Sequence, residues 1–132
     1  MIAAVYANLS DTERNWGDAT RESIHYEAAL SYMQESLSAS RKLPGDDVPT
    51  RRDVADSQIS IGRILGPLGR FDEAERYYLA ALPEFERLAA TDRDNLEARQ
   101  DLANLYNYRG ETLAMAGRAA EAERWTHRYL AV

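Results

Sequence analysis

The side chains that could carry out chemistry in this chain are two histidines and several carboxylates, since the sequence contains no cysteine. His25 and His127 are far apart in the sequence, and neither has an acidic residue or a histidine three or four positions later. That spacing would place a second metal ligand on the same helical face. Without cysteine there is no thiolate nucleophile and no cysteine metal site. We therefore predict no catalytic residue, no metal site and no enzymatic activity.

Acidic pairs occur at three places, Asp46-Asp47, Asp72-Glu73 and Glu121/Glu123. Carboxylates are favoured in the first turn of a helix by the helix dipole, so these pairs indicate helix starts and solvated faces. The glycines do not form a phosphate-binding loop of the type G-x-x-x-x-G-K-[ST]. The sequence therefore predicts no cofactor.

The overall charge disfavours two classes of partner. The chain has 132 residues and a formal net charge of -6 at pH 7. An acidic protein repels nucleic-acid backbones and anionic membranes, so we expect neither as a partner. The first residues, MIAAVYANLSD, lack the basic segment of a signal peptide, and no apolar run is long enough to cross a membrane. We expect a cytoplasmic protein.

Apolar residues recur at helical spacing along the whole chain, for example at Ile61, Leu65 and Leu68. We predict six helices, over about 3–23, 26–43, 50–68, 71–90, 95–116 and 119–131. Gly69 and Gly117 mark tight turns between helices, and Pro67 should end or kink the third helix. The pattern of Ser10 to Glu13 could start a helix there, but we favour one continuous first helix.

The helices form an internal repeat. Residues 51–82 align without gaps on residues 99–130 at a shift of 48, with both glycines and the segment EAER in register. A more degenerate copy lies upstream at a shift of 45, where Trp16-Gly17 aligns with Ile61-Gly62. We predict one domain, residues 1–132, with repeats over about 3–43, 50–90 and 95–132.

These residues resemble the tetratricopeptide repeat family, whose pattern places small and large apolar residues at fixed positions of two paired helices. The middle copy carries the resemblance best, through Ile61-Gly62, Leu65, Gly69, Phe71, Ala74, Tyr78 and Ala81-Leu82. The spacing of 48 is longer than the usual repeat and resembles long-repeat arrays common in bacterial signalling proteins. The closing proline is absent, and Arg109 stands where leucine is usual before Gly110.

The resemblance implies an all-α fold, a right-handed α-solenoid of three antiparallel helix pairs. Gly62 and Ala74 would allow two helices to approach closely, with Phe71 and Tyr78 filling the space beside them. Trp16, next to the small residue of the first copy, is expected in the core.

The same resemblance implies a concave groove, lined by the first helix of each pair, that binds a peptide or protein segment. The expected groove residues are Asp11, Arg14, Asp18, Arg21, Asp56, Ile59, Ser60, Arg63, Asn104, Asn107, Tyr108 and Glu111. The arginines 14, 21 and 63 could hold an acidic peptide. Alternatively, they pair internally with Asp18, Asp56 and Glu22.

The last predicted helix carries apolar residues with no following helix to cover them. These are Trp125, Tyr129, Leu130 and Val132. Self-association through this face, forming a homo-oligomer, is the alternative function; a partner chain or a longer natural protein would also cover it. The leading prediction is a non-catalytic scaffold for protein–protein interaction.

Overall fold

The computed structural model describes residues 2–42, 48–92 and 94–118, and this part of the chain is all-helical. Its helices are α1 (Ile2–Thr20), α2 (Ser23–Arg41), α3 (Val48–Leu65), α4 (Phe71–Thr91) and α5 (Leu96–Met115). The five corresponding predictions are confirmed with ends that differ by up to three residues. The sixth predicted helix, 119–131, lies outside the described residues. None of the described helices is long and apolar enough to cross a membrane.

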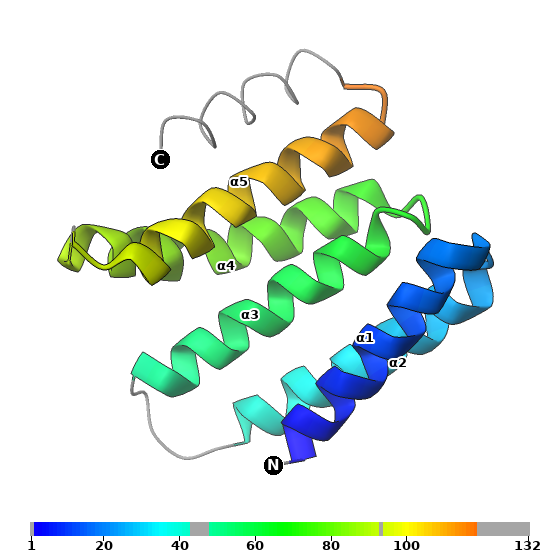
Figure 1. Cartoon of the computed structure of the whole chain (residues 1–132), viewed down its shortest axis with the longest axis horizontal. Coiled ribbons are helices and arrows are strands. Elements are labelled where there is room, and N and C mark those ends of the chain that lie inside the picture. The colour runs from blue at the N-terminus through cyan, green and yellow to red at the C-terminus, as the bar shows by residue number, and fades with distance from the viewer. Residues whose placement is uncertain (1, 43–47, 93, 119–132) are drawn as a thin grey trace.

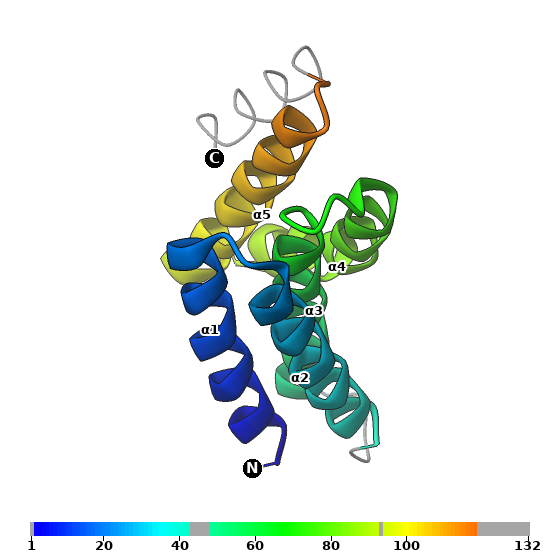
Figure 2. The same ribbon diagram turned by 90° about the vertical axis from the view of Figure 1, so that its right-hand side faces the viewer.

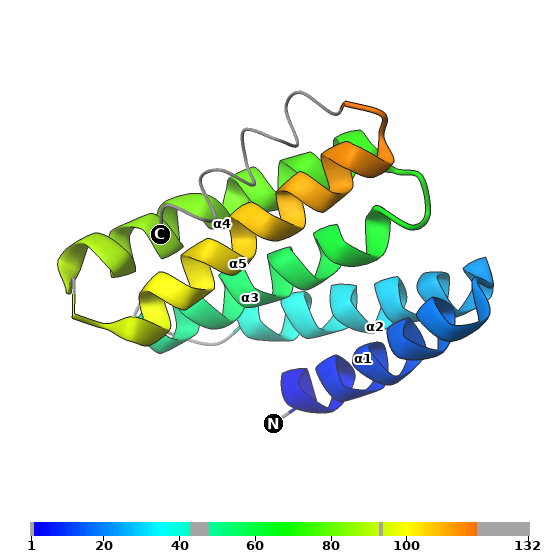
Figure 3. The ribbon, with the colours of Figure 1, turned by 45° about the horizontal axis from the view of Figure 1, so that its top comes forward.

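Each helix packs mainly on its neighbours in sequence, as Figure 1 shows. The first two form one antiparallel hairpin and α3 and α4 form the next, while α2 joins the two hairpins by packing on α3. Figure 2 shows the first hairpin at one end of the stack and α5 at the other. The odd-numbered helices α1, α3 and α5 all run in the same direction (Figure 3).

The second hairpin is held together by the small residues that the sequence predicted. A Cβ atom added at Gly62 would lie only 2.6 Å from Cε1 of Tyr78, so the ring of α4 sits directly on the backbone of α3. Ala74 and Phe85 are fully buried beside it. In the first hairpin, a Cβ at Gly17 would lie 3.1 Å from the ring of Tyr26. The close approach predicted for Gly62 and Ala74 is confirmed.

The turn residues explain where α3 ends. Pro67 follows the last helical residue, Leu65, because a proline cannot donate the next backbone hydrogen bond. Gly69 then adopts a φ of +77°, a left-handed conformation that suits glycine, and Gly117 does the same after α5 at +78°. Both glycine turns and the proline stop are confirmed.

The ends of the first hairpin differ from the prediction. Helix α1 stops at Thr20 rather than at residue 23, because Arg21 takes the left-handed position with a φ of 62°. Its backbone N–H donates to the Gly17 carbonyl oxygen at 2.7 Å and closes the helix. The prediction of one continuous first helix is confirmed, since α1 runs through Ser10 without a break. The buried Ser10 hydroxyl donates to the Ala29 carbonyl oxygen of α2 at 2.8 Å.

The N-terminal cap of α5 is Asn95, whose side chain accepts from the Ala98 N–H at 3.1 Å. The prediction that Trp16 lies in the core is wrong. Trp16 is 55% exposed instead of lying in the core. The ring that packs on Gly17 comes from Tyr26 of α2 instead.

Arg109, the departure from the family pattern, joins the last two described helices. Its guanidinium donates from Nε to both carboxylate oxygens of Glu75, at 2.7 and 2.9 Å. Both side chains are largely buried, so this ion pair replaces an apolar contact between α4 and α5 with a directional one.

Candidate functional site

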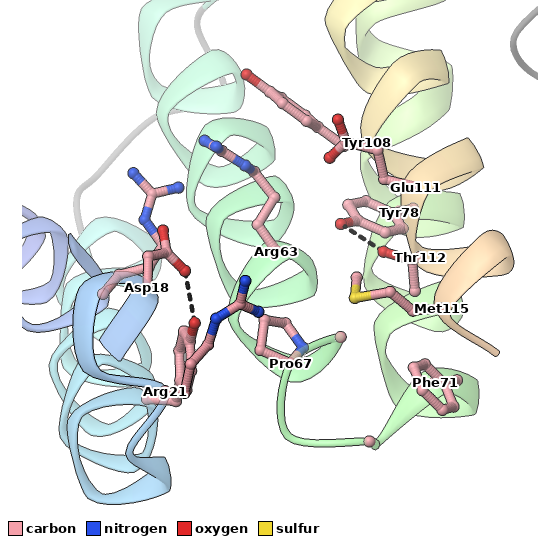
Figure 4. Close-up of a pocket in the computed structure, with 14 residues that line it drawn as sticks. Asp18, Arg21, Arg63, Pro67, Phe71, Tyr78, Tyr108, Glu111, Thr112 and Met115 are labelled. Atoms are coloured by element: carbon pink, nitrogen blue, oxygen red, sulfur yellow. Dashed lines mark hydrogen bonds between the residues drawn. The ribbon is translucent and has the colours of Figure 1, made fainter. Parts of the chain in front are cut away.

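A cavity of about 570 Å³ opens where the C-terminal ends of α1, α3 and α5 come together (Figure 4). Six of the predicted groove residues line it, namely Arg14, Asp18, Arg21, Arg63, Tyr108 and Glu111. Residues 14 and 18 share one face of α1, Arg21 directly follows that helix, and residues 108 and 111 share one face of α5. The turn after α3 forms part of the wall through Pro67 and Gly69.

The floor of this cavity is polar but internally satisfied. The hydroxyl groups of Tyr78 and Thr112 lie 3.2 Å apart and form a buried hydrogen bond between α4 and α5. Burial raises the pKa of the Tyr78 hydroxyl to about 12, so this group stays neutral at physiological pH. The floor therefore provides a fixed, uncharged surface beneath the arginines.

Arg63 reaches the cavity from the last turn of α3 and is held against α5. Its guanidinium carbon lies 4.0 Å from the centroid of the Tyr108 ring, a cation–π contact. Arg63 has no ion pair with any residue that the structure describes. Stacking of this kind leaves the edge of the guanidinium group, with its N–H donors, available to a ligand.

Arg14 is partly buried, with 17% of its side chain exposed. Its Nε atom is inaccessible to solvent and has no hydrogen-bond partner. One terminal nitrogen lies 3.6 Å from Oδ1 of Asp11, an ion pair between residues of the same helix. An unsatisfied buried donor costs free energy, and because this nitrogen is sealed from solvent, a ligand could reach it only if the side chain moved.

Arg21 is the left-handed residue that directly follows α1, and it lines the cavity. Figure 4 shows it on the same side of the cavity as Asp18. Its side chain forms no ion pair with any described residue. A left-handed conformation costs a non-glycine residue about 1–2 kcal/mol. The fold accepts this cost at a residue whose charge faces the cavity.

The carboxylates that were candidates for internal pairing have other partners. Asp18 accepts a hydrogen bond from the Tyr26 hydroxyl, at 2.6 Å from Oδ1. Burial, and secondarily this bond to Asp18, raises the pKa of Tyr26 to about 12. Glu22 lies 3.6 Å from Nε2 of His25. The geometry thus gives no support to pairing of the arginines with Asp18 or Glu22.

Asp56 and Ser60 line a second cavity, of about 210 Å³, at the other end of the space between α1 and α3. Desolvation, followed by repulsion from Asp101, raises the pKa of the Asp56 carboxyl to about 6, although the residue remains exposed at the cavity mouth. Arg52 is nearby but donates to Glu97 and Asp101, at 2.6 Å each. Asp56 therefore does not pair with the arginines of the larger cavity either.

The other predicted groove residues are more scattered. Ile59 is only 8% exposed and belongs to the hydrophobic core. Asn104 accepts from the Gln100 side chain, and Asn107 donates to Glu111, so both asparagines engage neighbours on α5. The predicted terminal interface of Trp125, Tyr129, Leu130 and Val132 lies outside the described residues.

A small polar cluster at the turn between α1 and α2 was not predicted from the sequence. His25 was expected in that turn but lies in the first turn of α2, where Nδ1 is 2.8 Å from Oε2 of Glu13. Its ring stacks on Trp16 at 4.6 Å between centroids. Glu13 belongs to the preceding helix, so spacing within one helix could not reveal this contact. Among the described residues, no group of three or more His, Cys, Asp or Glu side chains could hold a metal ion.

Comparisons with known proteins give no match: no family model, no curated protein and no solved structure is significantly similar to this chain. The resemblance to tetratricopeptide repeats therefore stays a prediction that is based on the residues themselves.

Proposed function

We propose that this chain is a non-catalytic helical-repeat module of the tetratricopeptide type that binds an acidic segment of a partner protein. In this proposal the helix pairs form a right-handed solenoid, and α1, α3 and α5 line its concave face. The common direction of these three helices, and the antiparallel packing of α1 with α2 and of α3 with α4, support this arrangement (Figure 3).

The observation that carries the proposal is the convergence of Arg14, Arg21 and Arg63 on one cavity. Two of them, Arg21 and Arg63, have no ion pair with a described residue, and Arg14 has one only with Asp11 of its own helix, at 3.6 Å. Two carboxylates, Asp18 and Glu111, also line the cavity, so its lining is positive in a chain whose net charge is -6. A ligand carboxylate would supply the acceptors that these guanidinium groups lack.

Arginine suits this role because its planar group can donate two parallel hydrogen bonds to one carboxylate. Each hydrogen bond to a charged group contributes about 1.5–3 kcal/mol in proteins. The apolar side chains of Phe71 and Met115 also line the cavity and would contact the non-polar part of a bound segment. We expect binding to depend on both charge and shape.

A fluorescein-labelled oligoglutamate peptide, followed by fluorescence anisotropy, tests the proposal. Reversal of Arg63 (R63E) should weaken binding at least about tenfold, because it removes one partner and introduces repulsion. The matched control is R76E, which reverses an exposed arginine on α4 outside the cavity. Equal loss in the two variants, or no binding to the parent protein, would contradict the proposed function.

Self-association through the predicted C-terminal helix is the competing role, and no contact among the described residues supports it. Light scattering at high protein concentration separates the two. A monomer that binds the acidic peptide supports the groove; a stable dimer with no peptide binding supports self-association.

A further inference from the structure

The smaller cavity has the chemistry of a site for a cation. It lies between α1, α2 and α3 and is lined by the carboxylates of Asp53 and Asp56 and by four serines, Ser36, Ser40, Ser57 and Ser60. Its volume, about 210 Å³, is less than half that of the arginine-lined cavity, and suits a single side chain rather than a large ligand. All six polar groups that line it can accept hydrogen bonds.

The described protein supplies no counter-ion for these carboxylates. Neither Asp53 nor Asp56 forms an ion pair with a described residue. The neighbouring Arg52 is occupied, because the same terminal nitrogen donates to Glu97 and to Asp101. The raised pKa of Asp56 has the same origin, since desolvation and the charge of Asp101 outweigh the attraction of Arg52.

Two buried hydroxyl groups provide independent evidence. Ser40 and Ser57 are 2% and 6% exposed and line the cavity. Neither side chain has a hydrogen bond to a described residue. Each hydroxyl oxygen keeps some contact with solvent. Buried hydroxyls normally find partners, so these two, which come from α2 and α3, point to a ligand in the cavity.

We propose that this cavity binds the ammonium group of a lysine side chain, carried by the same partner segment whose acidic part occupies the arginine-lined cavity. This inference rests on the proposed function. A primary ammonium group has three donors, which the two carboxylates and the hydroxyls of Ser40 and Ser57 can accept. The partner segment would then bind in one orientation. Its lysine would lie over the first half of α3 and its acidic residues over the second half.

The spacing along the helices fixes the separation of the two charges. Asp56 and Arg63 are seven residues apart on α3, and Ala7 and Arg14 are seven residues apart on α1. Seven residues make two helical turns, so both pairs share a face and their members lie about 10 Å apart. An extended peptide advances about 3.3 Å per residue, so the lysine and the acidic residue should be about three positions apart.

Two labelled peptides test this inference by fluorescence anisotropy. Both carry the same pair of glutamates; one has a lysine three positions away, and the other has alanine there. The parent protein should bind the lysine peptide about tenfold more tightly. Asp56→Asn should remove this gain and leave the affinity for the alanine peptide unchanged, whereas Glu86→Gln, an exposed substitution on α4, should preserve the gain.

The outcomes separate this inference from the proposed function. If the alanine peptide binds and lysine adds nothing, the cation site is refuted while the acidic-peptide site stands. If neither peptide binds, the proposed function fails and the inference fails with it. Titration with putrescine alone provides a further test. If this free diamine binds more tightly than the lysine peptide, and if Asp56→Asn abolishes that binding, the site would be assigned to a small amine instead.

Discussion

The guanidinium of Arg63 lies 4.0 Å from the centroid of the Tyr108 ring and joins α3 to α5 at the wall of the arginine-lined cavity. These two helices make few other contacts, since each packs mainly on α4. In Figure 4 the Arg63 side chain lies between Asp18 on one side and Tyr108 on the other. The pair therefore fixes the position of a guanidinium group that lines the cavity, by means of a contact between helices that are not neighbours in sequence.

Replacing Tyr108 with leucine should weaken binding of the acidic peptide more than it affects folding. The cation–π contact contributes about 0.5–1 kcal/mol at a partly exposed site, so the stability loss should be of that size. Peptide affinity should fall several-fold, because Arg63 loses its fixed orientation. Urea denaturation and anisotropy on the same variant measure the two effects. Tyr108→Phe is the control, and should preserve both; a loss as large as that of the leucine variant would argue against a role for the ring.

Adding a methyl group at Gly62 should destabilise the second hairpin. The new Cβ would lie 2.6 Å from a ring atom of Tyr78, so the ring or α3 must move. Overpacking of this kind costs about 1–3 kcal/mol, which exceeds the gain of about 1 kcal/mol from replacing a helical glycine. Gly17→Ala provides the comparison, because its Cβ would meet the Tyr26 ring at 3.1 Å and needs a smaller shift. Denaturation should show a clear loss for Gly62→Ala and a much smaller change for Gly17→Ala; the reverse order would contradict this packing.

Replacing Arg21 with glycine should change stability and binding in opposite directions. Glycine adopts the left-handed φ of 62° without strain, so the variant should gain about 1 kcal/mol in its free energy of unfolding. It should bind the acidic peptide less tightly, because one of three guanidinium groups is lost. Denaturation and anisotropy give the two values. A loss of stability would mean that the Arg21 side chain contributes more to the fold than its backbone costs.

Asp56 should make the protein less stable as the pH rises. Its folded-state pKa is about 6, above the ordinary value of 3.8, so the folded state holds the proton more strongly than the unfolded state. The resulting stabilisation is fully present below about pH 4 and is lost as the pH rises through about 6. Asp56→Asn removes this dependence. Its free energy of unfolding should therefore increase relative to the parent protein between pH 4 and 7, as measured by urea denaturation.

The control for the pH experiment is Glu86→Gln, on the exposed face of α4. The difference between this variant and the parent should stay flat over the same interval. A flat difference for Asp56→Asn as well would show that the carboxyl is well solvated in the folded protein.

The sequence alone determined the features that depend on local backbone chemistry and on small residues. Gly69 and Pro67 could be predicted to end α3, because glycine accepts a left-handed conformation and proline cannot continue a helix. Gly62 could be predicted to lie at a helix contact, because the repeat places it beside an aromatic residue. Six of the residues that were expected in a groove line one cavity, in part because helical spacing decides which side chains share a face.

Only the tertiary structure decided which groups meet across helices. The stacking of Trp16 on His25, the exposure of that tryptophan and the partner of Asp18 all depend on how far α2 is shifted along α1. Sequence spacing fixes the face of one helix but not its register against another, which follows from side-chain packing over the whole interface. For the same reason, the sequence could suggest that Arg14, Arg21 and Arg63 lie near one another, but only the fold shows that Arg21 and Arg63 have no ion pair with a described residue.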